Sequence, residues 1–204
     1  MSALPRALAA LKKADPALAR VIARAPRCDL RHERGFDPFA ALLSSICHQQ
    51  LTGKAAQTIL GRVKDRVGKG QWPTAAQVRR VKHETLRACG LSNAKALALK
   101  DLAAKVLDGT VPSAQAMAAM SDEAIVEALV QVRGIGEWTA HMVLMFRLGR
   151  LDVLPTGDYG VRKGFAQVYG RRALPTPRAL TAHAERWRPY RSVASWYLWR
   201  ALEL

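Results

Sequence analysis

Residues 129 to 140 read Leu-Val-Gln-Val-Arg-Gly-Ile-Gly-Glu-Trp-Thr-Ala and place a Gly-Ile-Gly turn between two stretches of helical hydrophobic periodicity. Because Gly134 and Gly136 lack side chains, we expect the main chain to adopt left-handed dihedral angles there and to lie close against a ligand. The N–H groups of this turn stand at the start of the following helix, a position that suits a phosphate. An isolated acid, Asp158, follows 22 positions after Gly136 and is the candidate catalytic group.

The composition favours a folded protein with a polyanionic partner. A chain of 204 residues with 50% hydrophobic residues is long enough for one globular unit or two small lobes with a buried core. Its 32 basic and 16 acidic residues give a formal net charge of +16, which favours nucleic acid as a partner. Genome composition also produces basic, Arg-rich chains, so the charge is supporting evidence only.

The cysteines and the apolar segments exclude several classes of protein. Cys28, Cys47 and Cys89 are odd in number and widely spaced, so they predict reduced, buried thiols and neither a disulfide framework nor a zinc site. No apolar run approaches the roughly twenty residues that cross a bilayer, and the N-terminus lacks the features of a signal peptide. Residues 1–13 are compatible with an amphipathic helix. We therefore expect a soluble, cytoplasmic protein.

Helical periodicity recurs along the chain and strand periodicity does not, which predicts an all-α fold. Ser121, and Thr176 followed by Pro177, are typical of helix starts. Glycines at the expected helix ends are Gly68, Gly90, Gly109, Gly149 and Gly170. The expected helices cover residues 17–24, 38–48, 52–67, 74–80, 83–88, 93–107, 122–132, 137–148, 159–169, 177–187 and 189–202.

Three separated motifs resemble those of the helix-hairpin-helix DNA glycosylases. They are the Gly-Ile-Gly turn, the segment 151–165 that contains Asp158, and Ser-Ile-Cys-His-Gln-Gln-Leu at 45–51. Residues 185–192, running on to Trp199, also resemble the AlkA-type 3-methyladenine DNA glycosylase II group. The resemblance spans about residues 36 to 200.

This resemblance implies two helical lobes with DNA bound across the cleft between them, without the N-terminal β lobe of the AlkA type. The central lobe is expected at residues 52–145, and the second lobe at 1–51 together with 146–204. The chain is then a single interleaved catalytic unit.

The implied activity is that of a monofunctional DNA glycosylase, which flips out an alkylated base and hydrolyses its N-glycosyl bond in base excision repair. Asp158 is the expected catalytic residue, although an aspartate before an apolar helix more commonly serves only as a cap. Because Trp138 stands where lyase relatives carry the lysine that forms a Schiff base, we expect the abasic site to be left uncut. Asp152, in the same loop, matches the family's motif less well and is interpreted as structural.

The base pocket that the resemblance implies is aromatic, and a cationic methylated base over an aromatic face gains about 0.5 to 2 kcal/mol. Met142 stands where the AlkA type carries a tyrosine, so the pocket is expected to be wider or less selective. Filling of the hydrophobic core is the alternative role for these rings, above all for Trp199. The expected pocket residues are Trp138, Tyr159, Trp199 and Met142.

The resemblance also assigns contacts with double-stranded DNA. Gln49, Gln50 and Leu51 are the candidates for an intercalating plug, with Gln50 and Leu51 favoured; a solvated turn with Leu51 in the core is the alternative. The expected DNA-binding residues are Gly134, Ile135, Gly136, Thr139 and Lys163.

No cofactor is expected to be required. The cysteine quartet that holds an iron–sulfur cluster in some relatives is absent from the sequence. The hairpin of the family can hold Na⁺ or K⁺ through main-chain carbonyls, which in this chain are those of Val130, Val132 and Ile135. A monomer associated with nucleoid DNA is expected.

Two other functions remain open at this point. A non-enzymatic helix-hairpin-helix module that binds distorted DNA accounts for the Gly-Ile-Gly turn and the charge, but not for Asp158 and the aromatic set. A glycosylase for a neutral lesion, such as hypoxanthine, uracil or an oxidised purine, remains compatible with Met142.

Overall fold

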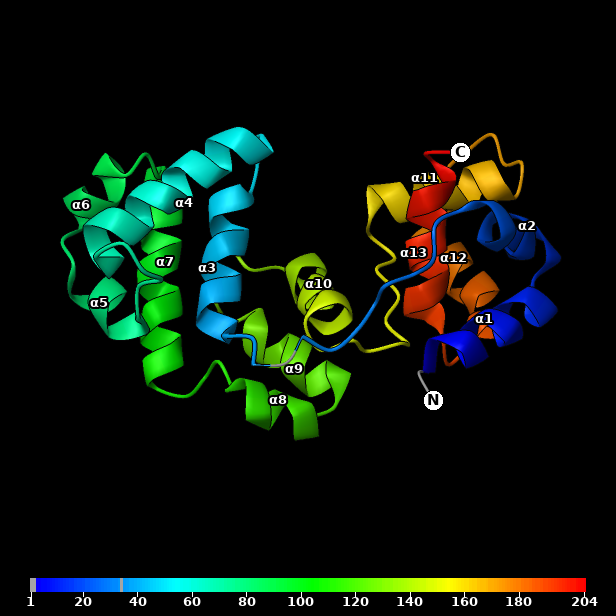
Figure 1. Ribbon diagram of the computed structural model, residues 1–204, viewed down its shortest axis with the longest axis horizontal. Helices are drawn as coiled ribbons and strands as arrows, with labels where there is room; N and C mark the ends of the chain where they lie inside the picture. Colours follow the sequence, from blue (N-terminus) through cyan, green and yellow to red (C-terminus); the bar gives the residue numbers. More distant parts are fainter. Residues whose placement is uncertain (1–2, 34) are drawn as a thin grey trace. The chain divides into compact units, whose positions relative to one another are not determined.

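The computed structural model describes residues 3–33 and 35–204. Within these ranges every regular element is a helix and no strand occurs, so the predicted all-α class is confirmed (Figure 1). No helix in the described part of the chain has the length and apolar character needed to cross a membrane.

The helices fall into two groups along the chain. Those near the chain ends are α1 (Ala3–Ala14), α2 (Pro16–Arg24), α11 (Tyr159–Val168), α12 (Pro177–Ala184), the 3-10 helix η1 (Glu185–Trp187) and α13 (Arg191–Ala201). Those between them are α3 (Pro38–His48), α4 (Gly53–Gly68), α5 (Ala75–Arg80), α6 (His83–Ala88), α7 (Asn93–Leu107), α8 (Ala114–Ala119), α9 (Asp122–Leu129) and α10 (Glu137–Phe146).

Most helix starts follow from capping residues that the sequence shows. The Oγ of Ser121 accepts a hydrogen bond from the Ala124 N–H at 3.2 Å, and Thr176 Oγ1 accepts one from Ala179 at the same distance. These bonds satisfy first-turn N–H groups that have no partner within the helix. The predicted ranges 38–48 and 93–107 coincide with α3 and α7.

Some predicted helices are longer than the observed ones. The range 122–132 ends three residues early because the chain enters the Gly-Ile-Gly turn, and the range 137–148 ends at Phe146 because the chain reverses at Gly149, with φ +64°. The range 177–187 divides into α12 and η1, and α13 begins at Arg191, after Pro189. Helix α8 was not predicted, since six residues are too few to establish a period.

The five predicted glycine stops are confirmed, and at four of them φ is positive: Gly90, Gly109, Gly149 and Gly170. At the fifth position Gly68 is the last residue of α4, and the left-handed residue is its C-cap, Lys69, with φ +55°. Gly68 serves another purpose. A Cβ there would lie 2.9 Å from the Pro73 nitrogen, so only glycine allows the chain to pass this closely.

The described chain divides into two compact units. Unit 1 combines the N-terminal residues up to Glu33 with His141–Leu204, and unit 2 comprises the intervening segment up to Ala140. This division differs from the predicted lobes, because α3 belongs with the central helices, where it packs against α4 and α7. The C-terminal boundary falls inside α10, after Ala140. In unit 1, α1 and α2 pack against α13, so the two ends of the chain share one core (Figure 1).

A buried carboxylate joins the two ends of the chain inside unit 1. Asp15, 2% exposed, caps α2 through the Leu18 N–H at 3.1 Å. Its Oδ2 accepts hydrogen bonds from Tyr169 Oη at 2.6 Å and Trp187 Nε1 at 2.9 Å, and it lies 3.3 Å from His183 Nε2. Burial raises the pKa of Asp15, but these hydrogen bonds outweigh it and lower the pKa overall. Asp15 is therefore a fully partnered structural anion.

Candidate active site

Asp158 stands at the N-terminus of α11 as its cap. The Oδ1 atom accepts a hydrogen bond from the Val161 N–H at 2.7 Å and another from the indole Nε1–H of Trp199 at 2.8 Å. The side chain is half-buried. Two N–H donors therefore fix the carboxylate at a helix start, where the helix dipole favours a negative charge.

Two glycines allow α13 to approach α11 closely enough for the Trp199 hydrogen bond. A Cβ at Gly160 would lie 2.8 Å from Trp199 Cδ1 and 3.2 Å from Asp158 Oδ1. A Cβ at Gly164 would lie only 2.0 Å from the Leu198 carbonyl oxygen. Sequence reasoning missed both residues, although two glycines four apart inside a helix already indicate a packing requirement.

The loop that precedes Asp158 is held by the first turn of α13. Asp152 accepts hydrogen bonds from Arg191 Nε at 2.8 Å and Nη2 at 2.9 Å, a two-pronged ion pair. The Ser192 N–H donates to the Leu151 carbonyl at 2.9 Å, and Ser192 Oγ accepts from the Val153 N–H at 2.8 Å. This arrangement agrees with the structural role expected of Asp152, and it fixes the start of the loop that carries Asp158.

The Gly134-Ile135-Gly136 segment, here called the hairpin turn, connects α9 to α10. Gly134 adopts φ +78° as expected, but Gly136 does not have a positive φ, so that part of the prediction is wrong. A Cβ at Gly136 would meet no heavy atom within 4 Å, which leaves the main chain open to an approaching ligand. The preceding Arg133 N–H donates to Asp101 Oδ2 on α7 at 2.7 Å and anchors the turn.

The side chains of the hairpin region differ in accessibility. Ile135 and Thr139 are buried, at 5% and 6% exposure, so their side chains are largely closed to a ligand at the surface. Trp138 is 52% exposed, and Met142 follows one helical turn later on the same face of α10.

In unit 1, Tyr159 is 64% exposed directly after Asp158. Trp199 is half-buried and stacks on Phe146, with ring centroids 5.9 Å apart and planes 29° apart. The structure thus places Trp199 against the catalytic candidate. The four expected pocket residues are divided between the units, with Trp138 in unit 2 and the other three in unit 1.

The segment Gln49–Leu51, here called the plug turn, follows α3 in unit 2. Gln49 is the C-cap of α3, and its side-chain Nε2 donates a hydrogen bond to the Gly134 carbonyl at 2.8 Å. Gln50 adopts φ +55°, which is unusual for a residue with a side chain. Leu51 is 41% exposed, which rules out the alternative that it fills the core.

Residues 43–189 match the HhH-GPD superfamily, described as base excision DNA repair proteins. The chain belongs to this superfamily. It is 36% identical over 168 residues to DNA-3-methyladenine glycosylase 1 of Schizosaccharomyces pombe, covering 82% of this chain and 74% of that protein. The predicted family is therefore confirmed.

Solved structures of HhH-GPD proteins have the same fold. The 3-methyladenine DNA glycosylase of Schizosaccharomyces pombe in complex with abasic DNA gives a TM-score of 0.84 at 33% identity, covering 98% of this chain and 97% of that one. The DNA-3-methyladenine glycosidase of Bacillus halodurans gives a TM-score of 0.83 at 36% identity, covering 94% and 86%. The two-lobed helix-hairpin-helix fold expected from the sequence is thus confirmed.

The remaining candidates of this HhH-GPD chain are a lysine for DNA binding and three cysteines. Lys163 is exposed on α11. Cys28, Cys47 and Cys89 are free and buried, and burial raises the pKa of the first two to about 11, so these thiols stay protonated near neutral pH. Among the described residues no group of three or more His, Cys, Asp or Glu side chains is arranged to hold a metal ion.

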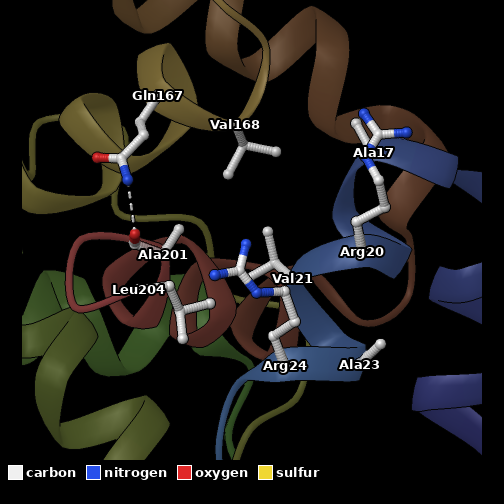
Figure 2. A pocket seen from close by; sticks show the side chains of 9 residues that line it. All are labelled: Ala17, Arg20, Val21, Ala23, Arg24, Gln167, Val168, Ala201 and Leu204. Carbon is white, nitrogen blue, oxygen red and sulfur yellow. Dashed lines mark hydrogen bonds between the residues drawn. The ribbon is translucent and has the colours of Figure 1, made fainter.

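Unit 1 also has a groove of about 540 Å³ at the surface of α2, α11 and α13 (Figure 2). Gln167 at its rim donates a hydrogen bond to the Ala201 carbonyl at 2.8 Å, and Arg20 and Arg24 of α2 border it. None of the expected site residues lines this groove, so we do not assign the reaction to it.

Proposed function

We propose that this HhH-GPD protein is a monofunctional DNA glycosylase that everts alkylated bases, mainly cationic methylated purines, and removes them by hydrolysis. The observation that carries the proposal is the carboxylate of Asp158, which is fixed by the N–H groups of Val161 and Trp199. The relatives named above are called 3-methyladenine glycosylases, which supports the same substrate class. Trp138, in place of a lysine, supports hydrolysis without strand cleavage.

The reaction needs an anion more than it needs an acid. When the N-glycosidic bond breaks, its electron pair leaves with the base and the deoxyribose acquires oxocarbenium character. A fixed carboxylate stabilises this positive charge and orients a water molecule toward the sugar carbon. The water oxygen bonds to that carbon, and one proton of the water passes to the carboxylate. The N–H groups of Val161 and Trp199 both act on Oδ1 of Asp158, so they hold the carboxylate in one orientation.

The preference for a cationic base follows from the leaving group. A methylated purine that already carries a positive charge departs as a neutral molecule without a proton donor, whereas an ordinary base needs one. The exposed rings of Trp138 and Tyr159 provide aromatic faces for such a cation. We assign them, with Trp199 and Met142, to the base pocket.

DNA binding is assigned to the hairpin turn and the plug turn. Gly136 leaves the main chain open at the start of α10, and the net charge of +16 favours a polyanion. Lys163 supplies a further phosphate contact.

We also propose an alkali cation on the main-chain carbonyls of Val130, Val132 and Ile135. The Val132 carbonyl accepts a hydrogen bond from the Ile135 N–H at 3.0 Å and keeps a second lone pair for the cation. We also propose that the protein acts as a monomer associated with DNA in the cytoplasm.

The decisive experiment is base release by Asp158→Asn, measured by mass spectrometry on a panel of duplexes that each carry one defined lesion. We expect wild-type protein to release cationic methylated purines, and the variant to lose about a hundredfold or more of that rate while still binding abasic DNA. Asp108→Asn is the matched control, because Asp108 also accepts a main-chain N–H, that of Thr110 at 2.9 Å, outside the site.

Each alternative has its own outcome in this assay. Full activity in Asp158→Asn overturns the mechanism. Binding without release of any base supports the non-enzymatic module, and release of only neutral lesions supports the third function. Binding should also weaken steeply with ionic strength, because phosphate contacts release counterions; binding that does not depend on salt contradicts the DNA clamp.

A further inference from the structure

We propose that Lys95 and Gln49 are positioning residues that fasten the plug turn to the hairpin turn, so that both engage DNA as one rigid frame. The inference rests on the proposed function and assigns residues to its eversion step. It uses contacts within unit 2 only.

Lys95 holds the end of α3 that leads into the plug turn. From α7, its Nζ donates hydrogen bonds to the carbonyls of Cys47 at 3.0 Å and Gln49 at 2.6 Å. Carbonyl groups at a helix C-terminus have no partner within the helix and carry its negative dipole end, so an ammonium group there makes charge-assisted bonds. The half-buried Lys95 therefore fixes the direction in which the chain leaves α3.

Gln49 connects the plug turn directly to the hairpin turn. Its Nε2 donates to the carbonyl of Gly134 at 2.8 Å, across 85 positions of sequence. Helix α7 braces both turns, because Asp101 accepts the Arg133 N–H at 2.7 Å two helical turns after Lys95. The two turns are thus joined to each other and to a common helix.

The backbone of the plug turn needs such bracing. Gln50 adopts φ +55°, a conformation that persists in a residue with a side chain only where the surroundings enforce it. The next residue, Leu51, presents a large apolar side chain to solvent at 41% exposure. A turn that is fixed in this way before DNA binds loses less conformational entropy on insertion than a flexible plug would lose.

This arrangement divides the three plug candidates by role. The amide of Gln49 is engaged with Gly134 and enters a duplex only by breaking that bond. Gln50 and Leu51 therefore form the part that inserts into the duplex. Gln49 keeps these two residues at a fixed distance from the hairpin turn, which binds the adjoining strand.

Three variants test the frame. Lys95→Met removes the ammonium group and keeps the chain length. Gln49→Glu is isosteric and turns a donor into an acceptor facing the Gly134 carbonyl. Lys100→Met is the matched control, because Lys100 lies on the same helix and donates in the same manner to the carbonyls of Arg79 and Val81, at the end of α5.

The measurement is single-turnover release of one methylated base from two duplexes, one with the lesion paired and one with it opposite an abasic site. Eversion is harder in the paired duplex, so loss of the frame acts mainly there. We expect Lys95→Met and Gln49→Glu to slow release from the paired duplex about tenfold, and from the second duplex less than about threefold. Lys100→Met should keep the wild-type ratio of the two rates.

The outcomes separate this inference from the proposed function. Wild-type protein that releases no base from either duplex contradicts the proposed function. Active wild-type protein with equal losses on both duplexes, or no loss in either variant, overturns the frame. If Lys95→Met unfolds, as judged by thermal denaturation, Gln49→Glu carries the test, since the Gln49 hydrogen bond is exposed and the substitution keeps the shape of the side chain.

Discussion

Gly160→Ala should slow base release strongly while changing the free energy of unfolding only a little, so it tests whether the orientation of the proposed catalytic carboxylate matters apart from protein stability. The added Cβ would lie 2.8 Å from Trp199 Cδ1 and 3.0 Å from Nε1, whereas ordinary contacts begin at 3.4 Å. The indole must therefore retreat by roughly 0.6 Å, which stretches its 2.8 Å hydrogen bond to Asp158 beyond the usual N–H···O range of about 2.7–3.2 Å.

Two opposing effects determine the stability of this variant. Alanine in a helix is favoured over glycine by up to about 1 kcal/mol, and overpacking costs about 1–3 kcal/mol. We therefore expect the free energy of unfolding to fall by only about 0–2 kcal/mol. A hydrogen bond to a charged group contributes about 1.5–3 kcal/mol, so its loss should slow base release about 10- to 100-fold.

The assay combines single-turnover base release with thermal unfolding. Gly61→Ala is the matched control, because Gly61 lies inside α4 and a Cβ there meets nothing within 4 Å. That variant should be more stable by about 1 kcal/mol and fully active. If Gly160→Ala releases bases at the wild-type rate, the Trp199 hydrogen bond does not position Asp158 for catalysis.

Three further outcomes are expected. Trp199→Phe keeps an aromatic ring but removes the indole donor, so base release should slow about tenfold or more while affinity for abasic DNA stays within about threefold. The free energy of unfolding should fall as the pH drops below about 6.5, because the unfolded chain then binds more protons than the folded chain. Burial lowers the pKa of His183 in the folded protein, and hydrogen bonds lower the pKa of Asp15. In denaturant titrations across pH 3–7, the loss of stability on the acid side, the acid limb, should be shallower for Asp15→Asn. Gln50→Gly removes the strain of a left-handed backbone at a residue with a side chain, so the free energy of unfolding should rise by about 0.5–1 kcal/mol. Base release from paired duplexes should become slower, because the variant lacks a side chain that inserts.

Each of these expectations has a control or a contradicting result. Trp196→Phe changes a buried tryptophan of the same helix outside the site and should remain active. Lys69→Gly relieves the same φ of +55° at the end of α4, so it should gain stability without slowing base release. An acid limb that is unchanged in Asp15→Asn contradicts the role given to the buried carboxylate.

Local signals predict most of the helices, and the family resemblance gives the candidate site, but neither predicts the contacts that hold the candidate site in place. Periodicity is sufficient for α3 and α7, whereas Asp158 is selected by its place in the segment 151–165 that resembles the family's motif. The bond from Gln49 to Gly134 joins residues 85 positions apart and exists only because α3 and the hairpin turn pack on one helix, information that no local window contains.

The glycines also divide into those whose role the sequence predicts and those whose role depends on tertiary contacts. Sequence reasoning treats a glycine as a source of backbone freedom, and this is correct at Gly134. Gly160 and Gly164 have helical dihedral angles and are needed because another helix lies against them. That requirement depends on the tertiary partner, so the sequence around Gly160 and Gly164 does not show it.

Unit 1 draws its helices from both ends of the chain, and this has a consequence for biosynthesis. The central segment is continuous, so its core can close as soon as the ribosome has released it. Helices α1 and α2 emerge before the central segment, yet Asp15 must wait for Tyr169 and Trp187, which are translated more than 150 residues later. We expect α1 and α2 to remain without these native neighbours until Trp187 has emerged from the ribosome, the interval in which chaperones would find them accessible.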